Sequence, residues 1–178
     1  MRSHRIAAGR RGGALILVLA VCLPAQQQRP GAIVESRGVR LQVPAGWSVN
    51  QNLIAAAGPI AITNFGGAYI RGGVLPSGGA EIEITSVPAP PDVAAYARNE
   101  LRGAAVEPVR PFSDSGKTGV QAAYTYEVTP RSFEKNVVIY IPRGPVLYKF
   151  YLSYWNGDRN EPAYIGTLGN IVREAQLR

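Results

Sequence analysis

Histidine and cysteine are nearly absent from this chain of 178 residues. The one histidine is His4 and the one cysteine is Cys22, so both lie before Gln26. These two residue types supply most nucleophile–base pairs, thiolate chemistry and soft or borderline metal ligands. The rest of the chain therefore offers no imidazole base, no thiolate and no disulfide. The sequence argues against a thiol or imidazole enzyme, and it predicts no metal and no cofactor.

Residues 1–25 have the organisation of a secretory signal peptide. Four arginines and no acid precede an apolar run at residues 14–25, and three glutamines follow that run. A membrane-spanning helix needs roughly 20 apolar residues, so this run is too short to be one. We expect cleavage after Ala25 and a secreted or periplasmic protein. The alternative is a bacterial lipobox at Leu19–Cys22, in which case a lipid on Cys22 would attach the protein to a membrane.

Most of the excess positive charge belongs to the same segment. The whole chain has 19 Lys and Arg and 12 Asp and Glu, which gives a net charge of +7. Four of the basic residues and none of the acids precede Ala25, so the remainder carries only +3. It contains no block of Lys and Arg of the kind that follows nucleic-acid phosphates. We therefore expect no nucleic-acid partner.

Residues 38–178 have a length that suits one domain with a single core, and we expect residues 26–37 to be a flexible segment before it. Apolar and polar residues alternate in six stretches that predict strands, at 39–43, 59–65, 81–87, 119–128, 132–141 and 146–155. The last of them is apolar on both faces, which predicts a central strand that is covered on both sides. The short connections predict an antiparallel sheet.

Two amphipathic segments, 92–101 and 160–177, predict helices. Asp92 suits the positive end of the first helix, and Asn160 suits the N-cap of the second. Gly166 and Gly169 weaken the second helix, and we expect them to let it lie close on the sheet. The predicted fold class is α+β, an antiparallel sheet of about six strands covered by helices.

Three residues are candidates for binding a ligand or partner. Gly and Pro are concentrated at positions 58–79, which predicts a long loop with Arg71 as a possible anchor. No Lys-Ser or Lys-Thr pair follows these glycines, so the loop does not match a phosphate-binding loop. Trp47 and Trp155 are the other candidates, as exposed anchors, because interface hot spots favour tryptophan.

Glu81 and Glu83 are predicted to share one face of their strand, with Ile82 and Ile84 on the other. Paired carboxylates hydrolyse glycosidic bonds when they face each other about 5–10 Å apart across a cleft. The second interpretation is a solvated strand face with no catalytic role. Each interpretation predicts a different position for these side chains.

Two segments resemble the PsbP-like family. Val39–Trp47 reads Val-Arg-Leu-Gln-Val-Pro-Ala-Gly-Trp, which is similar to the strand and Pro-x-Gly-Trp turn that open such domains. The aromatic strand Tyr148–Trp155 and the helix after it are similar to their closing elements, so the resemblance frames residues 38–177. The family includes extrinsic photosystem proteins, a Ran-binding nuclear transport factor, and small secreted bacterial proteins and lipoproteins. The resemblance implies an antiparallel sheet between helices and a non-catalytic role, and it transfers no site residue.

Three functional hypotheses follow. The first is a non-catalytic binding or accessory domain for a protein or a small ligand of the cell envelope. The second is an enzyme that uses only carboxylates, acting for instance on envelope glycans. The third is a structural envelope protein with no ligand of its own.

Overall fold

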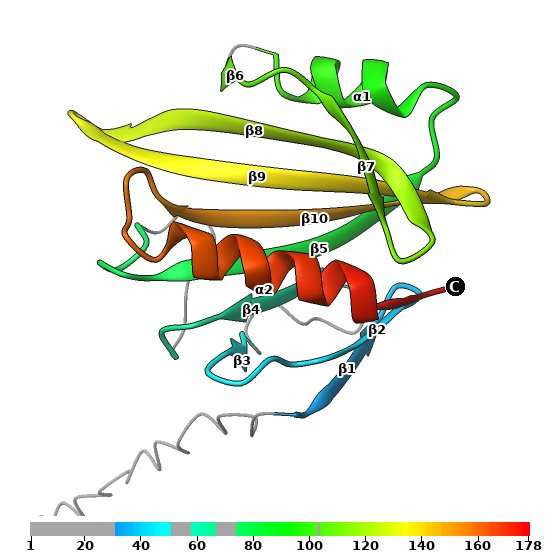
Figure 1. Ribbon diagram of the computed structural model, residues 1–178, viewed down its shortest axis with the longest axis horizontal. Coiled ribbons are helices and arrows are strands. Elements are labelled where there is room, and N and C mark those ends of the chain that lie inside the picture. Colours follow the sequence, from blue (N-terminus) through cyan, green and yellow to red (C-terminus); the bar gives the residue numbers. More distant parts are fainter. Residues whose placement is uncertain (1–30, 51–57, 67–73, 103) are drawn as a thin grey trace, which may run out of the picture.

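The computed structural model describes residues 31–50, 58–66, 74–102 and 104–178. Within these ranges the chain builds one eight-stranded sheet in which every pairing is antiparallel (Figure 1). The order across the sheet is β3-β4-β5-β10-β9-β8-β6, and β7 also pairs with β8. The strands are β3 (Ser48–Val49), β4 (Ile60–Thr63), β5 (Ala80–Pro88), β6 (Ala105–Val106), β7 (Arg110–Asp114), β8 (Lys117–Thr129), β9 (Ser132–Arg143) and β10 (Val146–Trp155).

A second, three-stranded sheet joins the two ends of the described chain. It contains β1 (Ile33–Ser36), β2 (Val39–Gln42) and β11 (Gln176–Leu177), in the order β1-β2-β11. The expectation of a flexible segment at 26–37 is therefore wrong for β1. That strand is ordered because it pairs along β2 and buries Val34 in the core at 6 % exposure.

Two helices pack on the large sheet, as the sequence predicted. In α1 (Val93–Glu100), Asp92 is the N-cap, and its carboxylate accepts the backbone N–H of Ala95 at 2.8 Å. Asn160 occupies the N-cap position of α2 (Glu161–Glu174), but its side chain makes no capping hydrogen bond. This helix ends before the predicted limit because the chain continues directly into β11.

The helices lie against opposite faces of the sheet (Figure 1). On the α2 face, the larger core collects apolar side chains of α2, β10, β9, β5, β4 and the small sheet. On the α1 face, Ala97 packs with side chains of β9 and β10 such as Val138 and Leu147. β10 lies between β5 and β9, and both Leu147 and Phe150 on its two faces are fully buried. The prediction of a central strand covered on both sides is confirmed.

The α1 face also carries an unusual row of buried polar side chains. Cross-strand register places Thr63, Glu81, Ser153 and Asn136 side by side on β4, β5, β10 and β9. Glu81 is only 7 % exposed, and the Ser153 hydroxyl donates to Asn136 Oδ1 at 2.6 Å. The expectation of a solvated face is therefore wrong for Glu81, whose side chain lies in this buried row between Thr63 and Ser153.

The glycines of α2 do not serve close packing. A Cβ added at Gly166 or Gly169 would meet no neighbouring atom within 4 Å, so the expectation that these glycines let the helix approach the sheet is wrong. The fold class itself is confirmed as α+β, with an antiparallel sheet and helices on it. In the described part of the chain, no helix combines the length and the apolar character needed to cross a bilayer.

Candidate functional site

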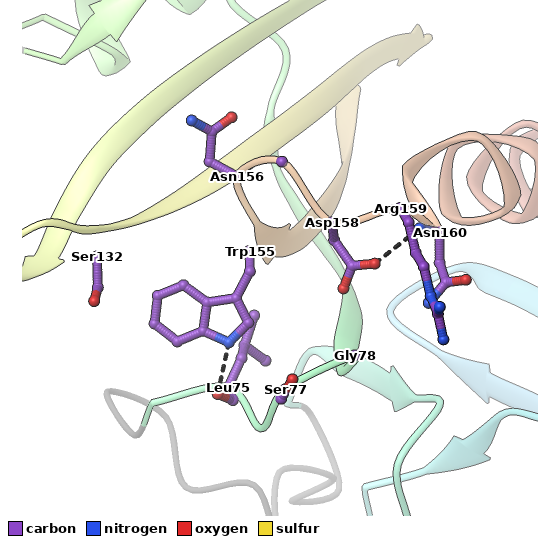
Figure 2. A pocket seen from close by; sticks show the side chains of 10 residues that line it. Leu75, Ser77, Gly78, Ser132, Trp155, Asn156, Asp158, Arg159 and Asn160 are labelled. Carbon is purple, nitrogen blue, oxygen red and sulfur yellow. Dashed lines mark hydrogen bonds between the residues drawn. The ribbon is translucent and has the colours of Figure 1, made fainter.

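Three connections meet at one end of the large sheet, on the left in Figure 1. They are the segment leading into β5, the turn between β8 and β9, and the loop between β10 and α2. Together they form a pocket of about 780 Å³, which we call the Trp155 pocket (Figure 2). Its described lining is Leu75, Ser77, Gly78, Ser132, Trp155, Asn156, Gly157, Asp158, Arg159 and Asn160.

The indole of Trp155 is held in one orientation. Its Nε1–H donates to the backbone carbonyl oxygen of Leu75 at 2.9 Å, and the Leu75 residue is only 2 % exposed. The Leu75 backbone also lies near the buried carboxylate of Glu134, which is the cross-strand partner of Trp155 on β9. This arrangement docks the segment before β5 onto the sheet end and fixes the indole beside the pocket.

Glu134 supports this arrangement from inside the protein. It is 2 % exposed, and the hydroxyl of Tyr126 donates to its Oε2 at 2.6 Å. Burial raises the pKa of the Glu134 carboxyl, although the hydrogen bonds from Tyr126 and from the Leu75 backbone act in the opposite direction. Because Glu134 is buried and does not line the pocket, its carboxylate does not contact a ligand there directly.

The loop between β10 and α2 is also held in place. Asp158 Oδ1 accepts the backbone N–H of Asn160 at 2.8 Å, which closes a local turn before the helix. The Tyr164 hydroxyl donates to the Gly78 carbonyl at 2.8 Å and lies 3.5 Å from Asp158 Oδ2. Figure 2 shows Asp158 and the exposed Arg159 on the same side of the indole. Tyr164 therefore joins two of the three segments that build the pocket.

The residues that the sequence predicted as binding anchors have different positions in the structure. Trp155 lines the pocket and is partly exposed. Trp47 is only 7 % exposed and belongs to the larger core, so the prediction of an exposed anchor is wrong for Trp47. It is buried because it packs in that core with apolar side chains of both sheets and of α2. Arg71 and Cys22 lie outside the described residues, and their proposed roles stay predictions.

Sequence reasoning missed most of the pocket. Leu75 and Asp158 are far apart in the sequence, and only the strand register brings their segments together. Glu134 could have been found from the sequence, because it lies on the same face of its strand as the apolar Val138 and Tyr140. A carboxylate on a face that is otherwise buried indicates a structural or functional role for that group.

A second, smaller hollow lies between α2 and strands β7 to β9, with a volume of about 230 Å³. At its edge the ammonium of Lys135 contacts the carboxylates of Glu161 at 3.1 Å and Glu107 at 3.5 Å. These two carboxylates therefore share one cation instead of facing each other across an open cleft. This is not the arrangement that a two-carboxylate hydrolase needs.

Lys149 fixes α1 to the sheet. It is 8 % exposed, pairs with Glu100 at 2.6 Å, and lies over the rings of Tyr96 and Tyr151. Burial, followed by the charges of Glu100 and Glu134, raises the pKa of the nearby Tyr124 to about 12. These aromatics serve packing, and the lysine is already paired. Among the described residues, no group of three or more His, Cys, Asp or Glu is placed to hold a metal ion.

Comparison by sequence finds no family model and no curated protein that matches this chain. Comparison of structures does find similar proteins. A protein from Bacteroides thetaiotaomicron has a TM-score of 0.53 at 10 % identity over 84 % of this chain, and this chain spans about half (49 %) of its length. The Ran-binding protein Mog1p of Saccharomyces cerevisiae has a TM-score of 0.53 at 11 % identity, covering 79 % of this chain and 90 % of Mog1p. A point mutant of Mog1 gives 0.54 at 12 % identity, covering 82 % of this chain and 95 % of the mutant.

At these identities the comparisons establish the fold alone. A Ran-binding protein is among the kinds of protein named above for the PsbP-like family. The structural match to Mog1p covers most of both chains. The β-sheet order and the terminal helix on the sheet agree with the opening and closing motifs at Val39–Trp47 and Tyr148–Trp155. The chain therefore has the PsbP-like α+β fold.

Proposed function

We propose that this protein is an exported, non-catalytic binding or accessory domain that recognises its partner at the Trp155 pocket. One observation carries the proposal: a partly exposed indole, fixed by its hydrogen bond to Leu75, stands in a wide pocket with a polar rim. Binding sites are typically pre-formed concave pockets of about 300–1,000 Å³ with a few convergent polar groups. Interface energy also concentrates on tryptophan.

The chemistry of the pocket supports binding over hydrolysis. Among its described lining residues, Asp158 is the one carboxylate. A carboxylate-only glycosidase needs a second carboxylate across the cleft, and Glu134 is buried away from the pocket. The remaining polar groups are serine hydroxyls, amides and one guanidinium, which can hold a ligand through hydrogen bonds.

The partner is either a protein or a small ligand of the cell envelope. The fold is compatible with a protein partner, since the similar Mog1p is a Ran-binding protein. A small ligand is supported by the size and polarity of the pocket. The structural-protein hypothesis gives no reason for a fixed tryptophan in an open pocket.

Export is the second part of the proposal, and it rests on the sequence of residues 1–25. N-terminal sequencing of the protein recovered from fractionated cells would test it, with Gln26 expected as the first residue. If the lipobox at Leu19–Cys22 is used instead, the protein carries labelled fatty acid and sediments with membranes. Recovery of the uncleaved chain from the cytoplasm would contradict export.

The binding site is tested by site-specific crosslinking in the native envelope. A photoreactive amino acid replaces Ser77 or Arg159 at the pocket, and Arg143 at the opposite end of β9 as the matched control. We expect the two pocket positions to capture one discrete species that the control position does not capture. That species should disappear when Trp155→Ala is added. Equal capture from Arg143, or capture that is insensitive to Trp155→Ala, would contradict the proposal.

A further inference from the structure

The Trp155 pocket offers a ligand the aromatic ring of Trp155 without its polar N–H. The polar edge of the indole is occupied, because Nε1–H donates to Leu75 at 2.9 Å inside the protein. Figure 2 shows the ring nearly face-on, with Ser132 on one side and Asp158 on the other. The face of an aromatic ring carries partial negative charge and attracts C–H groups of a ligand. The ring is therefore prepared to stack on a flat ligand surface that is rich in C–H bonds.

The rim of the pocket offers both donors and acceptors of hydrogen bonds. Asn156 and Asn160 carry amides that do both, and Ser77 and Ser132 carry hydroxyls that do both. Asp158 is held by the Asn160 N–H on Oδ1 at 2.8 Å, which leaves lone pairs on both of its oxygens for a ligand. A ligand that suits this rim has many groups that donate and accept, as vicinal hydroxyls do.

The charges of the rim give no net preference for an anionic or a cationic ligand. Asp158 and Arg159 are neighbours in the loop, so the described lining carries one negative and one positive group. A phosphate or carboxylate ligand would meet the Asp158 carboxylate beside the Arg159 guanidinium, and a cationic ligand would meet the Arg159 guanidinium beside the Asp158 carboxylate. Each would have to lose water near a like charge, which costs free energy. The balance favours a neutral, polar ligand.

We propose that the Trp155 pocket binds a neutral sugar unit of a glycan. A pyranose ring has an apolar face of C–H bonds that stacks on an indole, and an edge of hydroxyls that pairs with carboxylate, amide and guanidinium groups. In this mode Trp155 carries the stacking, while Asp158 accepts from hydroxyls and Arg159 donates to them. The volume of about 780 Å³ leaves room for a short oligosaccharide and exceeds the needs of one ring.

This inference rests on the proposed function and specifies the ligand class of the same site. Its test uses the protein without residues 1–25 and three neutral trisaccharides: maltotriose, cellotriose and fully N-acetylated chitotriose. Binding is measured by saturation-transfer NMR and by calorimetric titration at millimolar sugar. Adenosine monophosphate is the competing probe, because a nucleobase also stacks on tryptophan but brings a phosphate with it.

We expect at least one trisaccharide to bind, with saturation of the C–H protons on one ring face. Trp155→Ala should weaken that binding by about tenfold or more, since one stacked ring contributes on this scale. Arg159→Ala, at an exposed loop position where it cannot unfold the protein, should weaken it by about threefold, the scale of one hydrogen bond. Arg143→Ala at the other end of β9 is the matched control and should leave binding unchanged.

Three results would overturn the inference. They are the absence of binding by all three sugars, sugar binding that neither pocket variant weakens, and binding of adenosine monophosphate in preference to every sugar. If any of them occurs while crosslinking from Ser77 or Arg159 still captures a discrete protein, the pocket binds a protein partner. In that case the sugar inference fails and the proposed function stands.

Discussion

The hydrogen bond between Trp155 and Leu75 gives the most direct test of how the pocket is built. Trp155→Phe keeps an aromatic ring on β10 but removes the Nε1–H that donates to the Leu75 carbonyl at 2.9 Å. Leu75 is 2 % exposed, so water does not replace the lost donor without opening the segment. A buried acceptor left without a partner costs about 1–3 kcal/mol, and we expect the free energy of unfolding to fall by that amount.

The assay is urea unfolding followed by far-ultraviolet circular dichroism, because the substitution removes a fluorophore. The midpoint should move to lower urea with an unchanged slope, since the exposed surface on unfolding stays the same. Hydrogen exchange of the Leu75 amide should become faster in the variant, because the segment loses the hydrogen bond that holds it to Trp155. A loss below about 0.5 kcal/mol together with unchanged exchange at Leu75 would refute the reasoning.

A double-mutant cycle makes the test stricter. Trp155 and Glu134 are cross-strand partners that both lie beside Leu75, so their contributions should not be independent. We expect Trp155→Phe with Glu134→Ala to show a coupling of at least about 0.5 kcal/mol. The same cycle with Gly166→Ala on α2 is the control and should be additive. Additivity in both cycles would mean that the two residues do not act on a common segment.

The remaining predictions concern pH and the backbone. Burial raises the pKa of Glu134 in the folded protein, so folding favours the protonated carboxyl. The free energy of unfolding of the wild type, relative to that of Glu134→Gln, should therefore fall as pH rises from the ordinary carboxyl range through the raised pKa. Urea unfolding over a pH series measures this, and parallel profiles for the two proteins would contradict it. Gly166→Ala and Gly169→Ala should each stabilise α2 by about 0.5–1 kcal/mol in urea unfolding, because the added methyl meets no neighbour; destabilisation would show that the glycines are needed. Gly119→Ala should destabilise by about 3 kcal/mol or more, because its Cβ would lie 1.9 Å from the Tyr140 carbonyl oxygen, and a normal thermal midpoint would contradict that backbone approach.

The parts of the fold that depend on local patterns were predictable from the sequence. The two-sided apolar pattern of 146–155 placed β10 at the centre of the sheet, and Asp92 marked the start of α1. Five strands were missed for a common reason. They are short, and each is held by pairing with another strand rather than by its own periodicity: β1, β3, β6, β7 and β11.

The site was predictable only in part, because its geometry is non-local. Trp155 was identified from its type and its place at the end of a strand. Its partner Leu75 was not, because their contact depends on how the segment before β5 docks on the sheet. The prediction of an exposed anchor failed for Trp47 because that tryptophan packs in the core, together with residues of the small sheet. Residue type alone does not separate a core tryptophan from a site tryptophan.

The central claim is that recognition takes place at Trp155, and the two indole N–H signals of the protein test it most directly. The chain has two tryptophans, Trp47 in the core and Trp155 in the pocket, so each ¹H–¹⁵N spectrum contains its own internal control. On addition of soluble glycan and protein fractions from the native envelope, the Trp155 signal and the amides of residues 156–160 should shift or broaden. The Trp47 signal should stay in place. Binding that moves other surface amides and leaves the Trp155 indole unchanged would contradict the account.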